Sequence, residues 1–323
     1  MKKLLVSAFL FFVGFSLANA QTDALSKITK KDTSYWNATV LFGLNGTQTS
    51  FVNWAAGGRN NLSALGFLNG TASYHKNHWK WDNDLKVALG GVLFLDKAPG
   101  SKYQKTDDRI EANSTIGYEF KKKWFLTLTA GFKTQMMDGF MTPEDTLRSS
   151  TFMAPGYLNA ALGVEYAPSK YMNIFLSPIS LKYTFVRDQR LANEGAFGVE
   201  PAFSLGGTVI QTGKRFRQEY GAYFRFIFNK ELIKNIEMKS RLELFSNYLH
   251  NPQNIDVNAE VIFTFKVNSW LSASVQWDFI YDDDIKITDR FGKTGPRSQF
   301  KSILGLGVSY ALKSKNAKLA AKK

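Results

Sequence analysis

The sequence has no cysteine, and this absence excludes two classes of exported protein. A disulfide-stapled scaffold needs paired cysteines, and a lipoprotein needs one cysteine to carry its acyl chains. Charged residues are also sparse, at 21%, while 44% of the 323 residues are hydrophobic, which together exclude a disordered, highly charged chain. The composition therefore favours one compact folded unit.

Long hydrophobic runs are absent beyond residue 20. No stretch there approaches the ~20 consecutive apolar residues that a transmembrane helix needs, so residence in a membrane would require β-strands. At the start of the chain, a short basic segment precedes an apolar run over 4–17, and Ala-Asn-Ala at 18–20 has the pattern of a cleavage site. These features predict a signal peptide over 1–20. A membrane anchor is the alternative, although the run is short for one.

Histidine is scarce as well, with three residues in the chain. None of them has a serine two residues further on, the spacing that places a histidine and a serine on one face of a strand. Ser246 and His250 share a face, but no acid is evident to orient the histidine. We therefore expect no catalytic residue and no cofactor. A lipid-active hydrolase that uses His250 is the enzymatic alternative.

The strongest positive signal is an alternation of apolar and polar residues with a period of two. In the segment 124–135, the even positions are aromatic or aliphatic up to residue 132, whereas Thr127, Thr129 and Lys133 lie among the odd positions. This period is typical of a β-strand with one apolar face. Twelve such segments occur, at 35–46, 61–75, 79–95, 109–121, 124–137, 151–166, 171–187, 216–228, 235–248, 256–266, 270–285 and 298–312. Asn45-Gly46 and Asn69-Gly70 are hairpin signals that we interpret as lying at the end of a strand and within one.

The connections between these segments alternate in length. Short connections span 76–78, 122–123, 167–170, 229–234 and 267–269, and long ones span 47–60, 96–108, 138–150, 188–215 and 286–297, with 249–255 intermediate. Short turns at one end and long loops at the other are typical of outer-membrane barrels. We therefore predict an all-β fold, a 12-stranded antiparallel transmembrane outer-membrane β-barrel over 35–312, with 21–34 and the basic tail 313–323 in the periplasm. A soluble β-sandwich or soluble closed barrel is the alternative.

Aromatic residues follow four of the five short turns, at Trp79, Trp124, Tyr171 and Trp270. Such rings prefer a membrane interface, where an apolar body meets a wet edge. They predict an aromatic girdle at the periplasmic end of the barrel.

The polar face of the strands would then line the lumen. Alternation assigns eighteen charged residues to it, nine of each sign: Lys80, Asp82, Asp84, Lys86, Arg109, Glu111, Glu119, Lys133, Glu165, Glu219, Arg225, Glu237, Lys239, Arg241, Glu243, Glu260, Lys266 and Lys301. Opposite charges in a confined space are expected to pair across strands, because an unpaired charge there is costly. We expect a narrow or filled lumen.

The net charge of +14 comes mainly from lysines before the first strand, at the short turns and in the C-terminal tail. Such a rim could attract anionic lipid headgroups or an acidic protein partner in the periplasm or outer membrane, and a plain solvated rim is the alternative. Nucleic acid is not an expected partner, because no recognition fold accompanies the basic residues.

Two long loops carry further candidates. Asp282, Asp283 and Asp284, with Asp278 and Asp289 nearby, could bind Ca²⁺ or form a solvated acidic loop. The segment 188–215 is the longest connection, and it could either constrict the barrel or lie across its mouth.

The segment 53–61, Asn-Trp-Ala-Ala-Gly-Gly-Arg-Asn-Asn, and the later Trp81-Asp82-Asn83 resemble a family of Gram-negative exported proteins known only as a domain of unknown function. The resemblance implies an outer-membrane barrel and no agreed activity. In the first segment, Gly57 and Gly58 permit backbone angles that other residues avoid, and Trp54 can anchor the loop beside Asn60. An ordered plug or cap and an ordinary tight turn are both compatible with this motif.

The fold and the charged lumen favour a non-enzymatic barrel, a narrow channel or transporter for small polar solutes. A structural or accessory barrel that docks a partner or lipid headgroups through its basic rim or its loops is the alternative.

Overall fold

The structure is a computed structural model that describes residues 35–49, 60–95, 103–143, 145–288 and 293–313. The predicted signal peptide, the segment 21–34, the loop residues Trp54, Gly57 and Gly58, and the tail from 314 lie outside the described residues.

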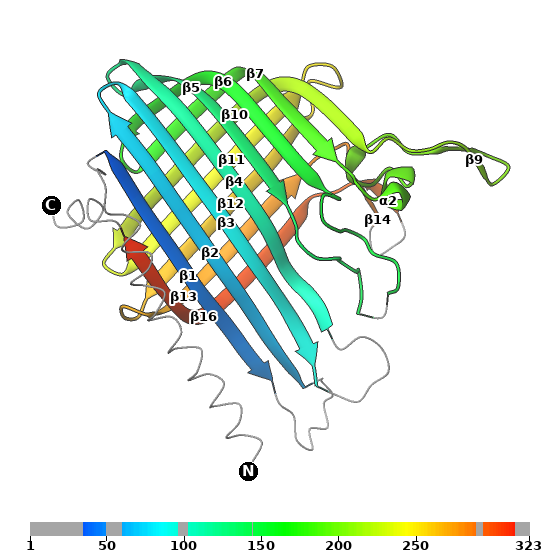
Figure 1. Cartoon of the computed structure of the whole chain (residues 1–323), viewed down its shortest axis with the longest axis horizontal. Helices are drawn as coiled ribbons and strands as arrows, with labels where there is room; N and C mark the ends of the chain where they lie inside the picture. Colours follow the sequence, from blue (N-terminus) through cyan, green and yellow to red (C-terminus); the bar gives the residue numbers. More distant parts are fainter. Residues whose placement is uncertain (1–34, 50–59, 96–102, 144, 289–292, 314–323) are drawn as a thin grey trace, which may run out of the picture.

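Twelve antiparallel strands form a closed barrel in the described chain, in agreement with the predicted fold (Figure 1). In chain order they are β1 (Trp36–Thr49), β2 (Asn61–Lys76), β3 (Trp79–Phe94), β4 (Tyr103–Lys121), β5 (Trp124–Thr134), β6 (Gly156–Ser169), β7 (Met172–Phe185), β10 (Phe216–Ile233), β11 (Ile236–Asn247), β12 (Ile255–Lys266), β13 (Leu271–Tyr281) and β16 (Gln299–Lys313). Each strand pairs with its neighbour along the chain, and β1 closes the ring against β16. Asn69-Gly70 lies inside β2, where Gly70 pairs with Val40, so it forms no turn.

Several strand boundaries differ from the prediction. β1 continues past Asn45-Gly46 to Thr49, β10 continues to Ile233 instead of ending at residue 228, and β13 ends at Tyr281 instead of residue 285.

Two further differences have a physical reason. β4 begins at Tyr103 instead of residue 109, because the register between β3 and β4 shifts at Gly90 and Gly91 and interrupts the alternation there. β6 begins at Gly156 instead of residue 151. Pro155 immediately precedes it and has no N–H to donate to a neighbouring strand.

The apolar faces of the strands point away from the barrel. On β5, Leu126 and Leu128 are 52% and 51% exposed, whereas Thr127 between them is 0% exposed. On β16, Leu304 is 78% exposed. The barrel therefore has the inverse polarity of a soluble barrel, with its apolar side chains outside and its polar ones inside.

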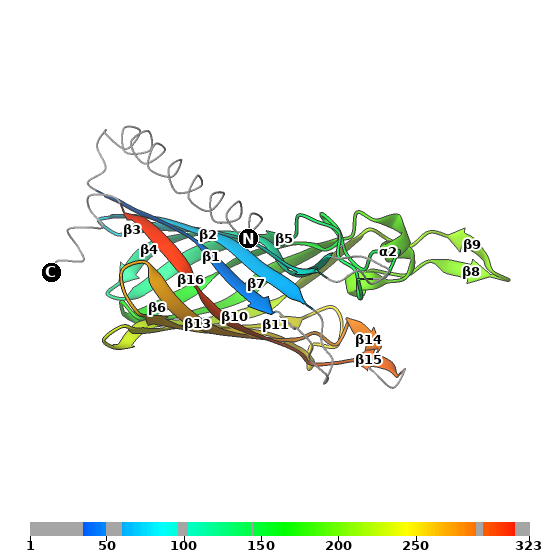
Figure 2. The same cartoon turned by 90° about the horizontal axis from the view of Figure 1, so that it is seen from below.

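Two long loops fold together at the end of the barrel opposite the short turns. The loop 186–215 contains α2 (Gln189–Asn193) and the short 3-10 helix η1 (Ala196–Gly198), and it packs against the loop 135–155. A small hydrophobic cluster forms between them, with all members at most 3% exposed: Ala154, Val186, Leu191, Ala192 and Val199. We call this unit the cap. It lies beyond the end of β7 and not inside the lumen (Figure 2).

Asp188 organises the cap. Its carboxylate accepts hydrogen bonds from the backbone N–H groups of Arg190 (2.8 Å) and Leu191 (3.2 Å), so it is the N-cap of α2, and from Nε of Arg148 (2.5 Å) in the other loop. Burial raises the pKa of Asp188, but these three hydrogen bonds outweigh it and hold the pKa below its usual value. The carboxylate therefore joins the two loops in its charged form.

Two short hairpins lie outside the barrel wall, and alternation did not predict them. One consists of β14 (Lys286–Thr288) and β15 (Thr294–Pro296), and the other of β8 (Phe203–Leu205) and β9 (Thr208–Gln211). The second hairpin projects away from the cap (Figures 1 and 2) and turns through Gly206 and Gly207, whose φ angles of 59° and 82° suit glycine. No helix among the described residues is long and apolar enough to span a bilayer.

Candidate functional site: a charged cavity inside the barrel

A cavity of about 520 Å³ lies inside the barrel, within the size range of small-molecule sites. Its lining comes from nine of the twelve wall strands and from the start of the loop after β13. No residue of the segment 188–215 lines the cavity, so that loop does not constrict it.

Ion pairs cross the middle of the lumen. Glu260 on β12 lies 3.1 Å from Nζ of Lys86 on β3 and 3.4 Å from Nη1 of Arg109 on β4. Strands β12 and β4 are six steps apart in the ring of twelve, which makes them opposite walls. Side chains from opposite walls therefore meet at this level, and the lumen is narrow there.

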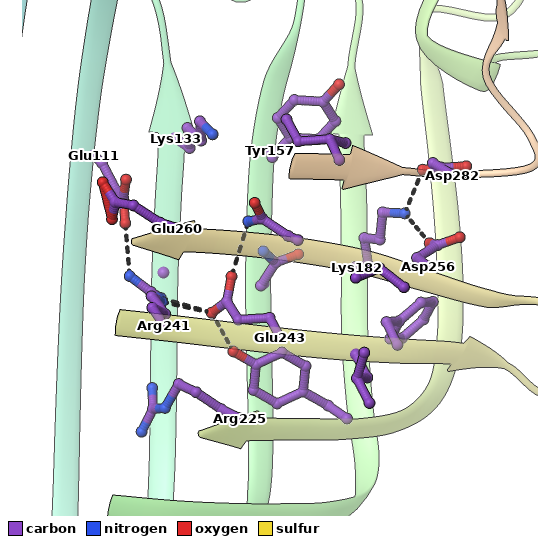
Figure 3. A pocket seen from close by; sticks show the side chains of 18 of the residues that line it. Glu111, Lys133, Tyr157, Lys182, Arg225, Arg241, Glu243, Asp256, Glu260 and Asp282 are labelled. Atoms are coloured by element: carbon purple, nitrogen blue, oxygen red, sulfur yellow. Dashed lines mark hydrogen bonds and ion pairs between the residues drawn. The ribbon is translucent and has the colours of Figure 1, made fainter. Parts of the chain in front are cut away.

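A second charged group lies beside this bridge (Figure 3). Arg241 on β11 binds Glu111 on β4 at 2.8 Å and Glu243 on its own strand at 2.7 Å. Glu243 also accepts hydrogen bonds from the hydroxyl of Tyr223 and from Nδ2 of Asn258 (3.0 Å). Every charged member has a partner, so the group is a fixed part of the wall.

Lys182 occupies the end of the cavity nearest the cap. Its ammonium lies 2.6 Å from Asp256 and 3.0 Å from Asp282 (Figure 3). Glu219 lies 3.7 Å from the same ammonium. Asp256, Asp282 and Asp283 bring oxygens within 4.8 Å of one another, a spacing that could hold a metal ion. Lys182 already supplies a cation to two of these three carboxylates.

The remaining acidic residues that were considered for Ca²⁺ have separate partners. Asp278 binds Lys301 at 2.9 Å, and Asp284 binds Arg217, while Asp289 lies outside the described residues. The acidic residues therefore do not converge on one centre in the described chain.

Toward the short turns, the interior is filled by side chains. Glu165 on β6 is 0% exposed and accepts hydrogen bonds from Lys80, Asn173 and Thr127. Phe175 is also 0% exposed, which leaves no room for water around it. The cavity thus ends above a packed layer of charged and aromatic groups.

The predicted lumen residues take three positions. Those that line the cavity are Arg109, Glu111, Lys133, Arg225, Arg241, Glu243, Glu260 and Lys301. Others form interior contacts outside its lining: Lys80 with Glu165, Lys86 with Glu260, Asp84 with Asn113, and Glu219 with Arg217. The remainder lie close to the short turns: Asp82 with His75, Glu237 with Lys239 and Lys266, and Glu119 with the backbone of Lys123.

Sequence reasoning missed Lys182, and a β-bulge explains the omission. Between Ser177 and Ser180 on β7 the register with both neighbouring strands shifts. Ser177 and Ser180 are both buried although their numbers differ in parity. Simple alternation from the start of β7 therefore places Lys182 on the wrong face. Pro178, which cannot donate to a ladder, is the sequence signal that could have indicated the shift.

Asp256 and Asp278 were also missed, although no bulge intervenes. Asp256 belongs to the same inward face as Asn258 and Glu260 on β12, and Asp278 pairs with Glu260 across the ladder. Alternation carried to the ends of these strands would have found both.

The predicted girdle aromatics all lie at the short-turn end. Trp79, Trp124, Tyr171 and Trp270 are between 37% and 54% exposed. Trp79 packs on Tyr118 with ring centroids 5.1 Å apart, and Trp124 stacks on Tyr166 at 4.6 Å. Of the loop motif, only Asn60 is described, and its carbonyl accepts a hydrogen bond from Leu95 at 2.8 Å.

The serine and histidine considered for catalysis are not joined. The hydroxyl of Ser246 donates to the carbonyl of Pro252 at 2.6 Å, and no hydrogen bond links it to His250 in the described chain. The geometry offers no activated nucleophile at this place.

Comparison with known proteins gives a family without a known activity. The family described as "Protein of unknown function (DUF3078)" matches residues 47–140. This part of the chain includes Trp54, Gly57 and Gly58 and the Trp81-Asp82-Asn83 element, and the match confirms the resemblance to such a family for this part. No curated protein matches the sequence.

Several solved barrels are distantly similar in structure. The translocator domain of the autotransporter NalP from Neisseria meningitidis is 8% identical, with a TM-score of 0.36, and the alignment covers 92% of this chain and 95% of that one. An outer-membrane channel from Pseudomonas putida F1 is 11% identical, with a TM-score of 0.39, covering 87% and 97%. The NanC porin is 8% identical, with a TM-score of 0.37, covering 85% and 100%. Similarities of this degree say nothing about a substrate or a partner.

Proposed function

We propose that this protein is a non-enzymatic outer-membrane barrel that conducts small polar solutes through a narrow, charge-lined interior. The observation that supports this most directly is the cavity of about 520 Å³, which is lined by charged side chains and enclosed by a wall whose apolar side faces outward. A wall of this polarity is stable in lipid, and an interior of this polarity accommodates water and polar solutes. Export would use the signal peptide predicted at 1–20, and the outer-membrane lipids would be the first partner.

The proposed conduit is narrow, for two reasons. Glu260 and Arg109 join opposite walls, and the packed layer around Glu165 lies beneath the cavity. Passage would require these side chains to move, so small currents and slow flux are expected in place of the high conductance of an open porin.

Reconstitution tests this function. The purified protein is inserted into planar bilayers and into liposomes, and we expect discrete conductance steps and an uptake of small polar solutes above that of protein-free liposomes. A protein that is folded in lipid but gives neither current nor uptake would refute the proposal.

A structural or accessory role is the second candidate. The filled interior near the short turns and the exposed lysines there favour it, since both suit docking at the periplasmic rim better than transport. Cross-linking in intact membranes is expected to recover a partner joined to the short-turn lysines. Recovery of the monomer alone would contradict this role.

A further inference from the structure

Arg225 is a buried cation with no carboxylate within ion-pair distance among the described residues. Arg225 lies in the middle of β10 and lines the cavity, and 6% of its surface is exposed. Its Nη1 donates to the hydroxyl of Thr129 at 3.3 Å, its guanidinium lies 5.3 Å from the ring centroid of Phe175, and its Nε has no hydrogen-bond partner among the described residues. A guanidinium has five donors, and an arginine buried to this extent is normally paired with an acid.

The acidic residues of the cavity, by contrast, all have basic partners. The lining contains eight acidic and six basic residues, and each of the eight acids lies within 4.0 Å of a lysine or arginine nitrogen. Among the six bases, Arg109, Lys182, Arg241 and Lys301 have such an acid. Within the part of the chain that the structure describes, Lys133 and Arg225 have none. The charged groups of the lining that have no ion-pair partner are therefore both cations.

The two unpaired cations face the same space. Thr129 accepts the hydrogen bond from Arg225 and lies on the inward face of β5. Lys133 lies on the same face, four residues or about 13 Å further along the strand. Arg225 thus lies at the inner end of the cavity and Lys133 nearer the cap. A solute that enters from the cap side would meet Lys133 first and Arg225 last.

We propose that the cavity is a binding site for a small oxyanion, a solute bearing a carboxylate or phosphate group, with the anionic group on Arg225. The planar guanidinium fork matches two oxygens of either group, a geometry that chloride does not offer. This inference deepens the proposed function by naming its solute class and rests on that function for passage, whereas binding can be measured without any passage.

Binding is tested on the full protein in detergent at pH 7 by calorimetric titration with inorganic phosphate and, separately, with acetate, chloride being the reference anion. We expect saturable binding of at least one oxyanion, no comparable binding of chloride, and a loss of affinity of at least tenfold in Arg225→Met. Arg225→Lys keeps the positive charge but lacks the planar guanidinium. Its affinity for the oxyanion is expected to lie between that of the unmodified protein and that of Arg225→Met.

Arg190→Met is the matched control, because Arg190 lies in the cap and pairs with Glu194 outside the cavity. It is expected to bind like the unmodified protein. Failure of both oxyanions to bind, equal binding of chloride, or unchanged affinity in Arg225→Met would each overturn the inference. If Arg225→Met does not fold, the titrations of the unmodified protein and of Arg225→Lys still decide it.

The outcome also separates this inference from the proposed function. Oxyanion binding without conductance would retain the site and refute the channel. Conductance without oxyanion binding would retain the channel and refute the site.

Discussion

At the scale of single residues, Glu260 carries the contact between the opposite walls. Its carboxylate binds Lys86 and Arg109, accepts a hydrogen bond from Gln276 at 3.3 Å, and is 16% exposed. Removing its charge would leave two cations facing a neutral amide in a confined space that is only partly hydrated. Loss of one partner of a buried ion pair is costly for this reason.

We expect Glu260→Gln to lower the free energy of unfolding by about 1–3 kcal/mol, below the 3–5 kcal/mol of a fully buried pair because the site is partly hydrated. The single-channel conductance should rise, since the bridge weakens. Denaturant unfolding in detergent and bilayer recordings measure the two effects.

Glu237→Gln is the control for this change. Glu237 also binds two cations, Lys239 and Lys266, but these are 49% and 46% exposed near the short turns. The expected loss is less than about 1 kcal/mol. Equal losses in the two variants would contradict a central role for the bridge at Glu260.

Asp188 gives the cap a dependence on pH. Its pKa is lowered in the folded protein, because the hydrogen bonds from Leu191, Arg148 and Arg190 outweigh the effect of burial. A lowered pKa stabilises the cap above the unfolded-state pKa of about 3.9, and this stabilisation is lost as the pH falls through the folded-state value. Hydrogen exchange of 186–215 should therefore be constant from about pH 8 to 5, after correction for intrinsic rates, and rise below about pH 4.

The variant Asp188→Asn tests the assignment of this effect. It keeps a side chain that can cap α2 but lacks the charge that binds Arg148, so its cap should be less protected at neutral pH and should not lose further protection in acid. A variant that follows the same pH profile as the unmodified protein would show that another group is responsible.

At the scale of elements, period-two alternation predicts the barrel because each wall position faces one of two environments. Leu126 and Thr127 illustrate this rule, because they are neighbours in the chain and yet are 52% and 0% exposed. Alternation cannot predict where a β-bulge adds one residue to a strand. Lys182 was missed because it follows the β-bulge in β7. It also cannot predict which residues meet across the lumen. Glu260 and Arg109 are 151 residues apart in the chain, and their contact depends on how the closed ring brings its walls together.

The bulge in β7 has a strong expected consequence. Deleting Pro178 would remove the extra residue, so that Ser180 follows Ser177 by two positions and both ladders continue without a bulge, while Lys182 keeps its inward position. We therefore expect this variant to form a barrel, as should Pro178→Ala, which keeps the residue count. Electrophoresis without heating distinguishes the compact barrel from the unfolded chain. A Pro178 deletion variant that does not fold would contradict the assigned register.

At the scale of the whole molecule, the outward apolar wall determines where the protein can reside. Exposed leucines occur on the wall and also on the hairpin of β8 and β9, which projects beyond the cap. The proposed membrane location assigns different surroundings to these two sets, lipid for the first and water for the second. Exposure alone does not distinguish them, because Leu304 on β16 and Leu205 on β8 are 78% and 68% exposed.

Arginine substitution distinguishes the two surroundings. Leu304→Arg places a charge on the outer wall, at a point within β16. A charge near the middle of a bilayer costs about 2–4 kcal/mol in such barrels. The free energy of unfolding measured in lipid vesicles should therefore fall by about this amount. Leu205→Arg places the same charge in water at the hairpin and should change the free energy of unfolding by less than about 0.5 kcal/mol. Equal effects at the two positions would mean that lipid does not cover the wall at Leu304, and the proposed outer-membrane residence would then fail.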